Sequence, residues 1–249
     1  MIKYQNMTWK EIQNNLSENT LILPIGSIEQ HSLHLPMAVD SIIAERLSEL
    51  LADNINGIVA PTIVYGANSL PNSGGGMEFI GTVGVTGTVL ISYYSEIVLG
   101  YIRAGAKKII VLNAHWENEA FIIESIESVK SRISHDVKIV ALSWWSVLNE
   151  SDVSKIFGYF DSWNVEHAGQ AETALMMYFA PQLVREFDNK IQNISFNPNI
   201  YISFKNEKIS NNFGALSKYS HVTYEMAIQF VEILLLRLTE TVGEIIENE

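Results

Sequence analysis

The sequence predicts a single α/β domain, residues 1–249, built around a mainly parallel sheet. Short apolar runs that are typical of buried strands alternate with longer segments in which apolar residues recur at helical spacing. No repeat, low-complexity segment or convincing linker interrupts the 249 residues, and this length suits one such domain. In sheets of this kind ligands bind beyond the carboxyl ends of the strands, so functional residues are expected there.

The expected elements follow in order along the chain. Thr8 and Glu11 have the spacing of a capping box, which predicts a short first helix. Apolar runs between turn formers predict four strands, at 21–25, 58–64, 108–112 and 137–142. Helical spacing of apolar residues predicts further helices, at 41–51, 89–104, 117–131, 171–179 and 223–246. The Gly- and Asn-rich stretch 66–87 is expected to form a functional loop, and the polar segment 188–220 hints at a strand only at 201–204.

Composition and charge exclude several classes of function. Sixteen Lys and Arg residues against 28 Asp and Glu give a formal charge of −12, which disfavours binding to nucleic acid or to anionic lipid. The chain has no Cys, which excludes disulfides, thiolate metal sites and Cys nucleophiles. The first residues are polar, and no apolar run approaches the ~18 residues of a membrane span. We therefore expect a soluble, cytoplasmic protein.

Two predicted strand ends carry a carboxylate and an imidazole two residues apart. Glu29 and His31 follow the strand at 21–25, while His115 and Glu117 follow the strand at 108–112. Because residues i and i+2 of an extended backbone project to the same side, each pair can offer one oxygen and one nitrogen ligand. Asp40 adds a fifth group. Either motif alone could be a hydrogen-bonded surface pair, but together they suit two ions, zinc or manganese, that share a carboxylate.

Two further motifs have both a functional and a structural interpretation. Glu166 and His167, preceded by Trp163, could act as general acid and base beside an aromatic wall, or could simply begin a helix. Ser73–Gly76 could cradle phosphate through backbone N–H groups, but the motif lacks Lys and a clear preceding strand. A tight loop near the mouth of the crevice is the favoured interpretation of this second motif.

Five ordered motifs carry a resemblance to a known family: GSIEQHSLHLPMAVD at 26–40, SGGGMEFIGT at 73–82, NAHWENEAFIIES at 113–125, SWW at 143–145 and WNVEHAGQAETALM at 163–176. The chain resembles the creatininase (creatinine amidohydrolase) family, and its motifs are more similar to creatininase itself than to the wider family. The resemblance implies a three-layer α/β/α sandwich and a homo-oligomer, commonly a hexamer. It also implies hydrolysis of a cyclic amide, creatinine with water giving creatine, and the reverse.

The resemblance further implies roles for individual residues. One ion, manganese or zinc, would be held by Glu29, Asp40 and His115, and a second, usually zinc, by His31, Asp40 and Glu117. A hydroxide that bridges the two ions would attack the substrate carbonyl, while Glu166 and His167 would shuttle the proton. Substrate contacts would come from six side chains, those of Ser73, Trp116, Trp145, Trp163, Asn164 and His167.

The sequence also departs from the creatininase pattern. Trp116 stands where creatininase has Tyr and Asn164 where it has Asp, while Ala114 replaces Gly and Ser32–Leu33 replaces Gly-Pro. The five metal positions are intact, so hydrolytic chemistry is expected. Two changed side chains lie where the substrate would be recognised, which leaves open creatinine, another small amide, a formamide or a lactam. A non-catalytic protein that binds a small molecule is the remaining alternative.

Overall fold

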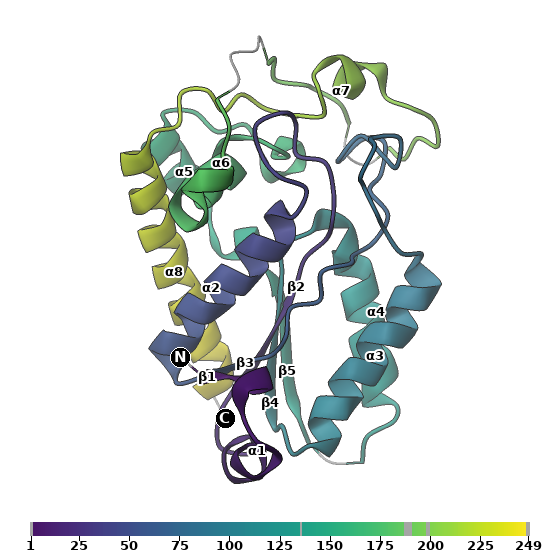
Figure 1. Ribbon diagram of the computed structural model, residues 1–249, viewed down its shortest axis with the longest axis vertical. Coiled ribbons are helices and arrows are strands. Elements are labelled where there is room, and N and C mark those ends of the chain that lie inside the picture. The colour runs from purple at the N-terminus through teal and green to yellow at the C-terminus, as the bar shows by residue number, and fades with distance from the viewer. Residues whose placement is uncertain (1, 135, 187–190, 198–199, 248–249) are drawn as a thin grey trace.

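A computed structural model describes residues 2–134, 136–186, 191–197 and 200–247. At its centre is a five-stranded sheet whose neighbouring strands are all parallel. The strand order across the sheet is β1 (Ile2–Lys3), β3 (Ile58–Val59), β2 (Leu21–Ile25), β4 (Lys108–Asn113) and β5 (Lys138–Ser143). Helices cover both faces of this sheet (Figure 1), which confirms the expected three-layer α/β/α sandwich. That residues 1–249 form a single domain stays a prediction.

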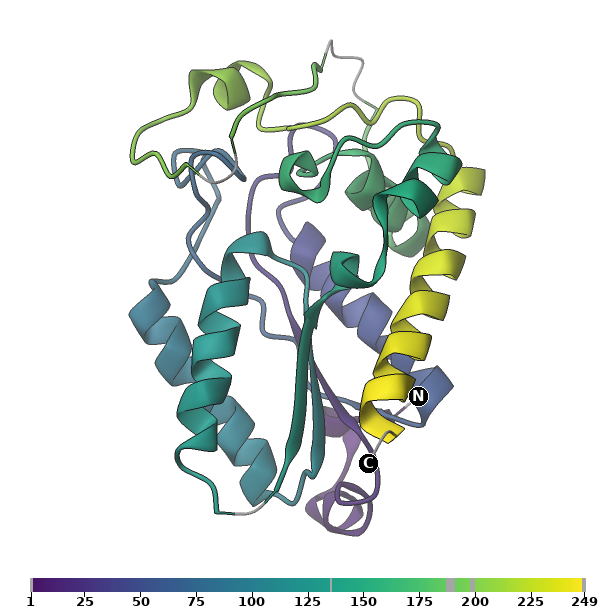
Figure 2. The same ribbon diagram turned by 180° about the vertical axis from the view of Figure 1, so that it is seen from behind.

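The central strands are buried on both faces, because successive side chains of a strand point to opposite sides. Leu21, Leu23 and Ile25 pack in the core cluster of α3 (Gly87–Arg103) and α4 (Glu119–Lys130). Ile22 packs on the other side, with α2 (Val39–Ile55), α6 (Gln170–Phe179) and α8 (Tyr224–Glu247). The two helical layers are visible on either side of the sheet in Figure 2.

The remaining helices are short. The predicted capping box begins α1 (Trp9–Asn15): the Glu11 carboxylate accepts from the Thr8 N–H at 2.7 Å, and the Thr8 hydroxyl accepts from the Glu11 N–H. The sequence did not predict α5 (Glu150–Phe157) or α7 (Glu207–Asn211). Five single turns of 3₁₀ helix complete the described elements, at Tyr4–Asn6, Trp116–Asn118, Trp144–Val147, Trp163–Val165 and Pro181–Leu183.

Two strand predictions differ from the structure. The strand expected at 58–64 ends at Val59, because Pro61 has no N–H to donate to a ladder, and Ile63 forms only an isolated bridge with Ile25. The strand hint at 201–204 is wrong: the described part of 188–220 contains no strand, and Tyr201 is 68% exposed. Residues 188–190 and 198–199 of that segment lie outside the described residues.

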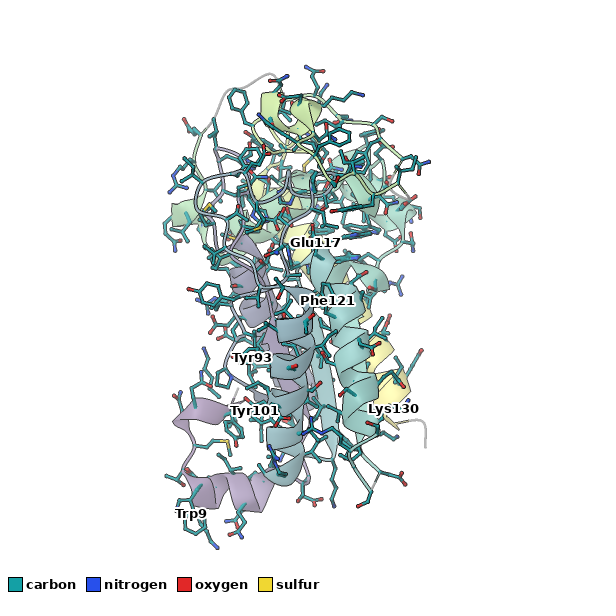
Figure 3. The ribbon with its side chains drawn as sticks, turned by 90° about the vertical axis from the view of Figure 1, so that its right-hand side faces the viewer. Trp9, Tyr93, Tyr101, Glu117, Phe121 and Lys130 are labelled. Carbon is teal, nitrogen blue, oxygen red and sulfur yellow. The ribbon has the colours of Figure 1, made fainter. Side chains whose placement is uncertain are left out.

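Because the strands are parallel, their carboxyl ends meet at one edge of the sheet, beneath the long loops. In Figure 3, Glu117 lies at this end of the molecule, where the chain enters α4, whereas Lys130 and Trp9 lie toward the opposite end. The polar motifs of the sequence are therefore gathered at the edge where a ligand site is expected. Among the described residues, no helix combines the length and apolar character needed to cross a membrane.

Candidate active site

The register of the two central strands brings the two polar loops together. Ile25, the last residue of β2, lies opposite Asn113, the last residue of β4. The pairing continues for one more step, since the Ala114 N–H donates to the Ile25 carbonyl at 2.9 Å. Gly26 follows at a point of close approach, where a Cβ would lie 2.5 Å from the backbone of Ser41. The loops that follow β2 and β4 therefore begin at the same level along the two paired strands.

A buried asparagine, Asn118, links these two loops to a third loop. The Asn118 amide nitrogen donates to the Gly26 carbonyl and to Asn113 Oδ1, both at 3.1 Å. Its oxygen accepts from the Ala67 N–H at 2.8 Å and from the Tyr94 hydroxyl at 3.3 Å. The loop that begins after β3 is thus fixed against the ends of β2 and β4.

His115 lies among three carboxylates. Its Nδ1 is 3.0 Å from Glu29 Oε2 and 3.2 Å from Asp40 Oδ2, and its Nε2 is 3.4 Å from Glu117 Oε2. Nε2 also lies 3.1 Å from the Ala67 carbonyl, which can only accept, so Nε2 carries a proton, while Nδ1 is the nitrogen that faces Glu29 and Asp40. Burial opposes a charged imidazole, yet the neighbouring Glu117 and Glu29 hold the pKa of His115 well above its usual range.

His31 forms a second centre beside the first. Its Nε2 is 3.0 Å from Asp40 Oδ1 and 3.6 Å from Glu172 Oε1. Its Nδ1 lies 3.1 Å from the Glu29 carbonyl, so Nδ1 carries a proton, and Nε2 is the nitrogen that faces the two carboxylates. Asp40 therefore lies between the two histidines, with one oxygen facing each.

The cluster has the character of a cation site. His31 Nε2 and Asp40 Oδ2 are buried, and neither makes a hydrogen bond within the described residues. Two groups of side chains bring candidate ligand atoms within 4.8 Å of one another: Glu29, His115 and Glu117 in one, and His31, His167 and Glu172 in the other. With Asp40, the cluster holds four buried carboxylates, whose charge two divalent ions would balance. Nitrogen and oxygen donors without sulfur suit zinc or manganese.

All five metal ligands expected from the sequence are in this cluster, but their grouping differs from the one that the resemblance implies. The resemblance pairs Glu117 with His31, whereas the structure sets Glu117 against His115. Glu117 also accepts from the Leu70 N–H at 2.8 Å and from the Ser73 hydroxyl. Glu172, which the sequence analysis did not select, lies beside His31 instead. Only its place within the motif 163–176 could have indicated a functional role. An acid in the first turn of a helix is also explained by the helix dipole, which favours negative charge there.

Glu166 and His167 lie beside the cluster, and no contact between their two side chains occurs among the described interactions. Glu166 lies before α6 rather than inside its first turn. It accepts from the Ala171 N–H at 2.7 Å and from the Ser217 hydroxyl at 2.9 Å. Burial, reinforced by the charge of Glu172, raises the pKa of Glu166 to about 8. His167 Nε2 lies 3.5 Å from Glu29 Oε1, on the side of the cluster.

Gln30 is a second residue that the sequence analysis missed. Its amide nitrogen lies 2.8 Å from the Gly74 carbonyl, 3.1 Å from the Gly214 carbonyl and 2.9 Å from His167 Nε2. The amide nitrogen is a donor, so His167 Nε2 is the acceptor of this pair. Gln30 thus joins the glycine-rich loop to His167. Only its position between Glu29 and His31 could have drawn attention to it.

A cavity of about 510 Å³, part of it open to solvent, lies over the cluster. All six side chains expected to contact substrate line it, as do Glu166 and Gly74. Four tryptophans form one wall: Trp116 stacks on Trp145 with ring centroids 5.7 Å apart, and Trp144 packs edge-on against Trp145 and Trp163, each at 5.4 Å. The sequence analysis did not select Trp144. Ser73 and Gly74 of the glycine-rich motif line the cavity.

Comparison with known proteins agrees with this geometry. A family model described as creatinine amidohydrolase (creatininase) matches residues 5–242. Creatinine amidohydrolase of Pseudomonas putida is 33% identical over 186 residues, 72% of each chain. A 3-dehydro-scyllo-inosose hydrolase of Thermotoga maritima is 26% identical over 187 residues, which are 74% of this chain and 58% of that one.

Solved structures show the same likeness. A crystal structure of creatinine amidohydrolase superimposes with a TM-score of 0.91 and 27% identity, covering 98% of this chain and 97% of that one. Related creatininase structures are described as a manganese form and a Zn-Zn type. With the donor groups described above, these forms confirm the expectation of zinc or manganese. Since the family model spans nearly the whole sequence and the fold is shared throughout, this chain belongs to the creatininase family, whose relatives named here are hydrolases.

Proposed function

We propose that the protein hydrolyses the C–N bond of a small cyclic amide in this cavity, and that creatinine, with water giving creatine reversibly, is its substrate. The observation that carries the proposal is the convergence of buried histidine nitrogens and carboxylate oxygens, among which His31 Nε2 and Asp40 Oδ2 make no hydrogen bond within the described residues. The 33% identity to a creatinine amidohydrolase supports the choice of substrate.

Two divalent ions, zinc or manganese, fit the donor atoms. Nδ1 of His115 would hold one together with Glu29 and Asp40, and Nε2 of His31 would hold the other together with Asp40 and Glu172. Bound there, the ions would polarise the amide carbonyl and lower the pKa of a water molecule. Glu117 stays a candidate ligand through its position beside His115.

The protein side chains supply proton transfer and orientation. Without metal, burial and the charge of Glu172 raise the pKa of Glu166 to about 8, and this buried carboxyl is the group placed to give a proton to the departing nitrogen. His167 and Glu166 line the same cavity, where substrate or water would carry a proton between them. The stacked Trp116 and Trp145 offer flat apolar surfaces on which a planar ring can lie.

The proposal predicts metal-dependent turnover. Protein loaded with zinc or manganese should bind about two ions per chain and convert creatinine, and a chelator should abolish the activity. Asp40→Ala should lose both ions and activity, because Asp40 faces both histidines. Glu124→Ala, which removes an exposed carboxylate from α4, is the control and should behave as the wild type. Full turnover by Asp40→Ala would refute the assignment.

A second candidate is the same chemistry on another small amide, a formamide or a lactam. Trp116 and Asn164, two of the departures from creatininase, both line the cavity, and the Thermotoga relative is named for a different substrate. Rates on a panel of lactams, cyclic ureas and formamides, measured beside creatinine, would separate the two candidates. If creatinine is the substrate, Trp116→Tyr and Asn164→Asp should raise kcat/KM for it.

Assembly and location are also proposals. We propose a homo-hexamer of the 28.0 kDa chain in the cytoplasm, with no nucleic acid or membrane as partner. Light scattering should then give six times the chain mass, and cell fractionation should recover the protein with cytoplasmic markers. A monomer in light scattering would refute the hexamer.

A further inference from the structure

A second hollow adjoins the catalytic cavity. Ser73, Trp116 and Asn164 line both, so the two spaces meet along these three side chains. The second hollow encloses about 640 Å³, part of it open to solvent. Two of the three shared residues, Trp116 and Asn164, are those that depart from the creatininase pattern.

The rest of its lining is almost entirely apolar. We call this hollow the outer groove, and its apolar wall consists of Leu70, Phe196, Ile200, Tyr201 and Ile202. Asn72 completes it, and no charged side chain or histidine is among the described residues that line it. The groove is therefore suited to a neutral, apolar group rather than to a charged one.

Hydrogen bonds and packing hold the groove in shape. The Asn72 amide nitrogen donates to the Ile200 carbonyl at 3.2 Å, and the Asn206 amide nitrogen donates to Asn72 Oδ1 at 2.8 Å. Phe196 packs against a buried cluster that includes Leu216, and Leu216 in turn lines the catalytic cavity. A groove that is formed in advance loses little conformational entropy when a ligand enters.

The apolar side chains of the groove face water. Tyr201 is 68% exposed, Ile200 56% and Trp116 39%. Contiguous exposed apolar side chains around a hollow are characteristic of ligand grooves. The continuity of the groove with the catalytic cavity indicates which ligand would cover it, because a substrate that extends past Trp116 enters it directly.

We propose that the outer groove binds an uncharged apolar or aromatic substituent of a substrate whose amide lies at the carboxylate and histidine cluster. This inference rests on the proposed hydrolysis of a small amide and extends its substrate class: besides creatinine, the site would accept N- or acyl-substituted amides that are larger. Creatinine carries only a methyl group and would leave the groove unfilled. A substituent of the size of a phenyl ring would displace water from Ile200, Tyr201 and Trp116.

Hydroxamic acids provide a direct test, because the hydroxamate group chelates zinc and anchors the probe at the cluster. Acetohydroxamic acid is compared with a phenyl-bearing series whose linkers increase by one methylene at a time, each binding to zinc-loaded protein being measured by calorimetry. At least one phenyl-bearing probe should bind about tenfold more tightly than acetohydroxamic acid, since the ring is partly buried. A phenyl-bearing probe with a carboxylate on its ring should lose this gain in affinity.

Variants of groove residues test whether the gain in affinity arises in the outer groove. Ile200→Asp and Tyr201→Ser should each reduce the ratio of phenyl to acetyl affinity severalfold. Val89→Asp is the matched control, because Val89 lies on α3 outside the groove and is 55% exposed, close to the exposure of Ile200. The affinity ratio of this control should equal that of the wild type.

The possible outcomes distinguish failure of the groove proposal from failure of the proposed function. Tight acetohydroxamate binding without a phenyl gain overturns the groove proposal and leaves the proposed function standing. A phenyl gain combined with affinities that are unchanged when the metal is removed supports the groove while contradicting the metal site, and absence of binding by every probe overturns both. A change of mass in light scattering for Ile200→Asp, with an unchanged affinity ratio, would assign the groove to a contact between subunits and overturn the proposal.

Discussion

Replacing Gly74 by alanine would place a methyl group in the space that the Glu29 carboxylate occupies. A Cβ at residue 74 would lie 1.6 Å from Glu29 Oε1 and 2.5 Å from Ser69 Oγ. The first distance falls 1.4 Å short of the 3.0 Å below which real Cβ contacts essentially do not occur. Glu29 is buried and lies 3.0 Å from His115 Nδ1 on its other side, so the carboxylate has to turn away from His115 or the loop has to open.

Either adjustment disturbs a candidate ligand. Because small displacements around metal ligands commonly cost affinity, Gly74→Ala should bind its first zinc about 10- to 100-fold more weakly. Overpacking should also lower the free energy of unfolding of the metal-free protein by about 1–3 kcal/mol. Calorimetric titration of zinc into demetallated protein measures the first effect, and urea denaturation measures the second.

Gly76→Ala is the matched control within the same loop. Its Cβ would meet nothing closer than 3.6 Å, but its φ of +80° strains alanine, so stability should fall while zinc affinity stays near that of the wild type. If Gly74→Ala binds zinc as tightly as the wild type, the reasoning fails, because either Glu29 does not hold the metal or Gly74 does not set its position.

Three further predictions concern residues around the cluster. Glu172→Gln should lower the metal content from about two ions per chain to about one, measured by elemental mass spectrometry, and two retained ions would exclude Glu172 as a ligand. In metal-free protein the folded state raises the pKa of Glu166 from 4.5 to about 8, so it holds this proton more tightly than the unfolded chain does. The stabilisation is therefore complete below about pH 4 and lost as pH rises toward about 8. In urea titrations at several pH values, Glu166→Gln should reduce the fall in the free energy of unfolding between about pH 4 and 8. An unchanged pH dependence would contradict this role of Glu166. Asn118→Ala should lower the free energy of unfolding by about 3 kcal/mol or more, because it leaves buried backbone groups of Gly26 and Ala67 without partners; a loss below about 1 kcal/mol would refute this role.

The parts of the fold that the sequence predicts are those set by local pattern. The strand at 21–25 has the observed bounds, since an apolar run between turn formers is buried on both faces whatever its neighbours are. The helix at 150–157 was missed because it is only eight residues long: Val153, Ile156 and Phe157 follow helical spacing, but over little more than one turn. The incorrect strand hint at 201–204 arose from apolar residues that line a groove instead of a sheet.

The candidate site likewise contains residues that local sequence motifs predict and residues that they do not. The five expected ligands lie in two short motifs, so their chemistry is visible in consecutive residues. Gln30 was missed because its contacts with Gly74, His167 and Gly214 span 44, 137 and 184 residues, distances over which sequence pattern carries no signal. Glu172 reaches His31 only because α6 packs beside α2, a contact between helices that no local motif specifies.

The origin of the candidate ligands in distant parts of the chain has a consequence for how the protein matures. Asp40 and His31 are synthesised early, but Glu172 leaves the ribosome only after the whole sheet has been made, and α6 then has to pack against α2 and α8. If the ions bind as proposed, a nascent chain cannot complete the pair of sites, so loading follows folding. Metal binding then stabilises only finished chains. A cell short of zinc or manganese would accumulate fully folded, unloaded protein that recovers activity as soon as metal is supplied, without new synthesis.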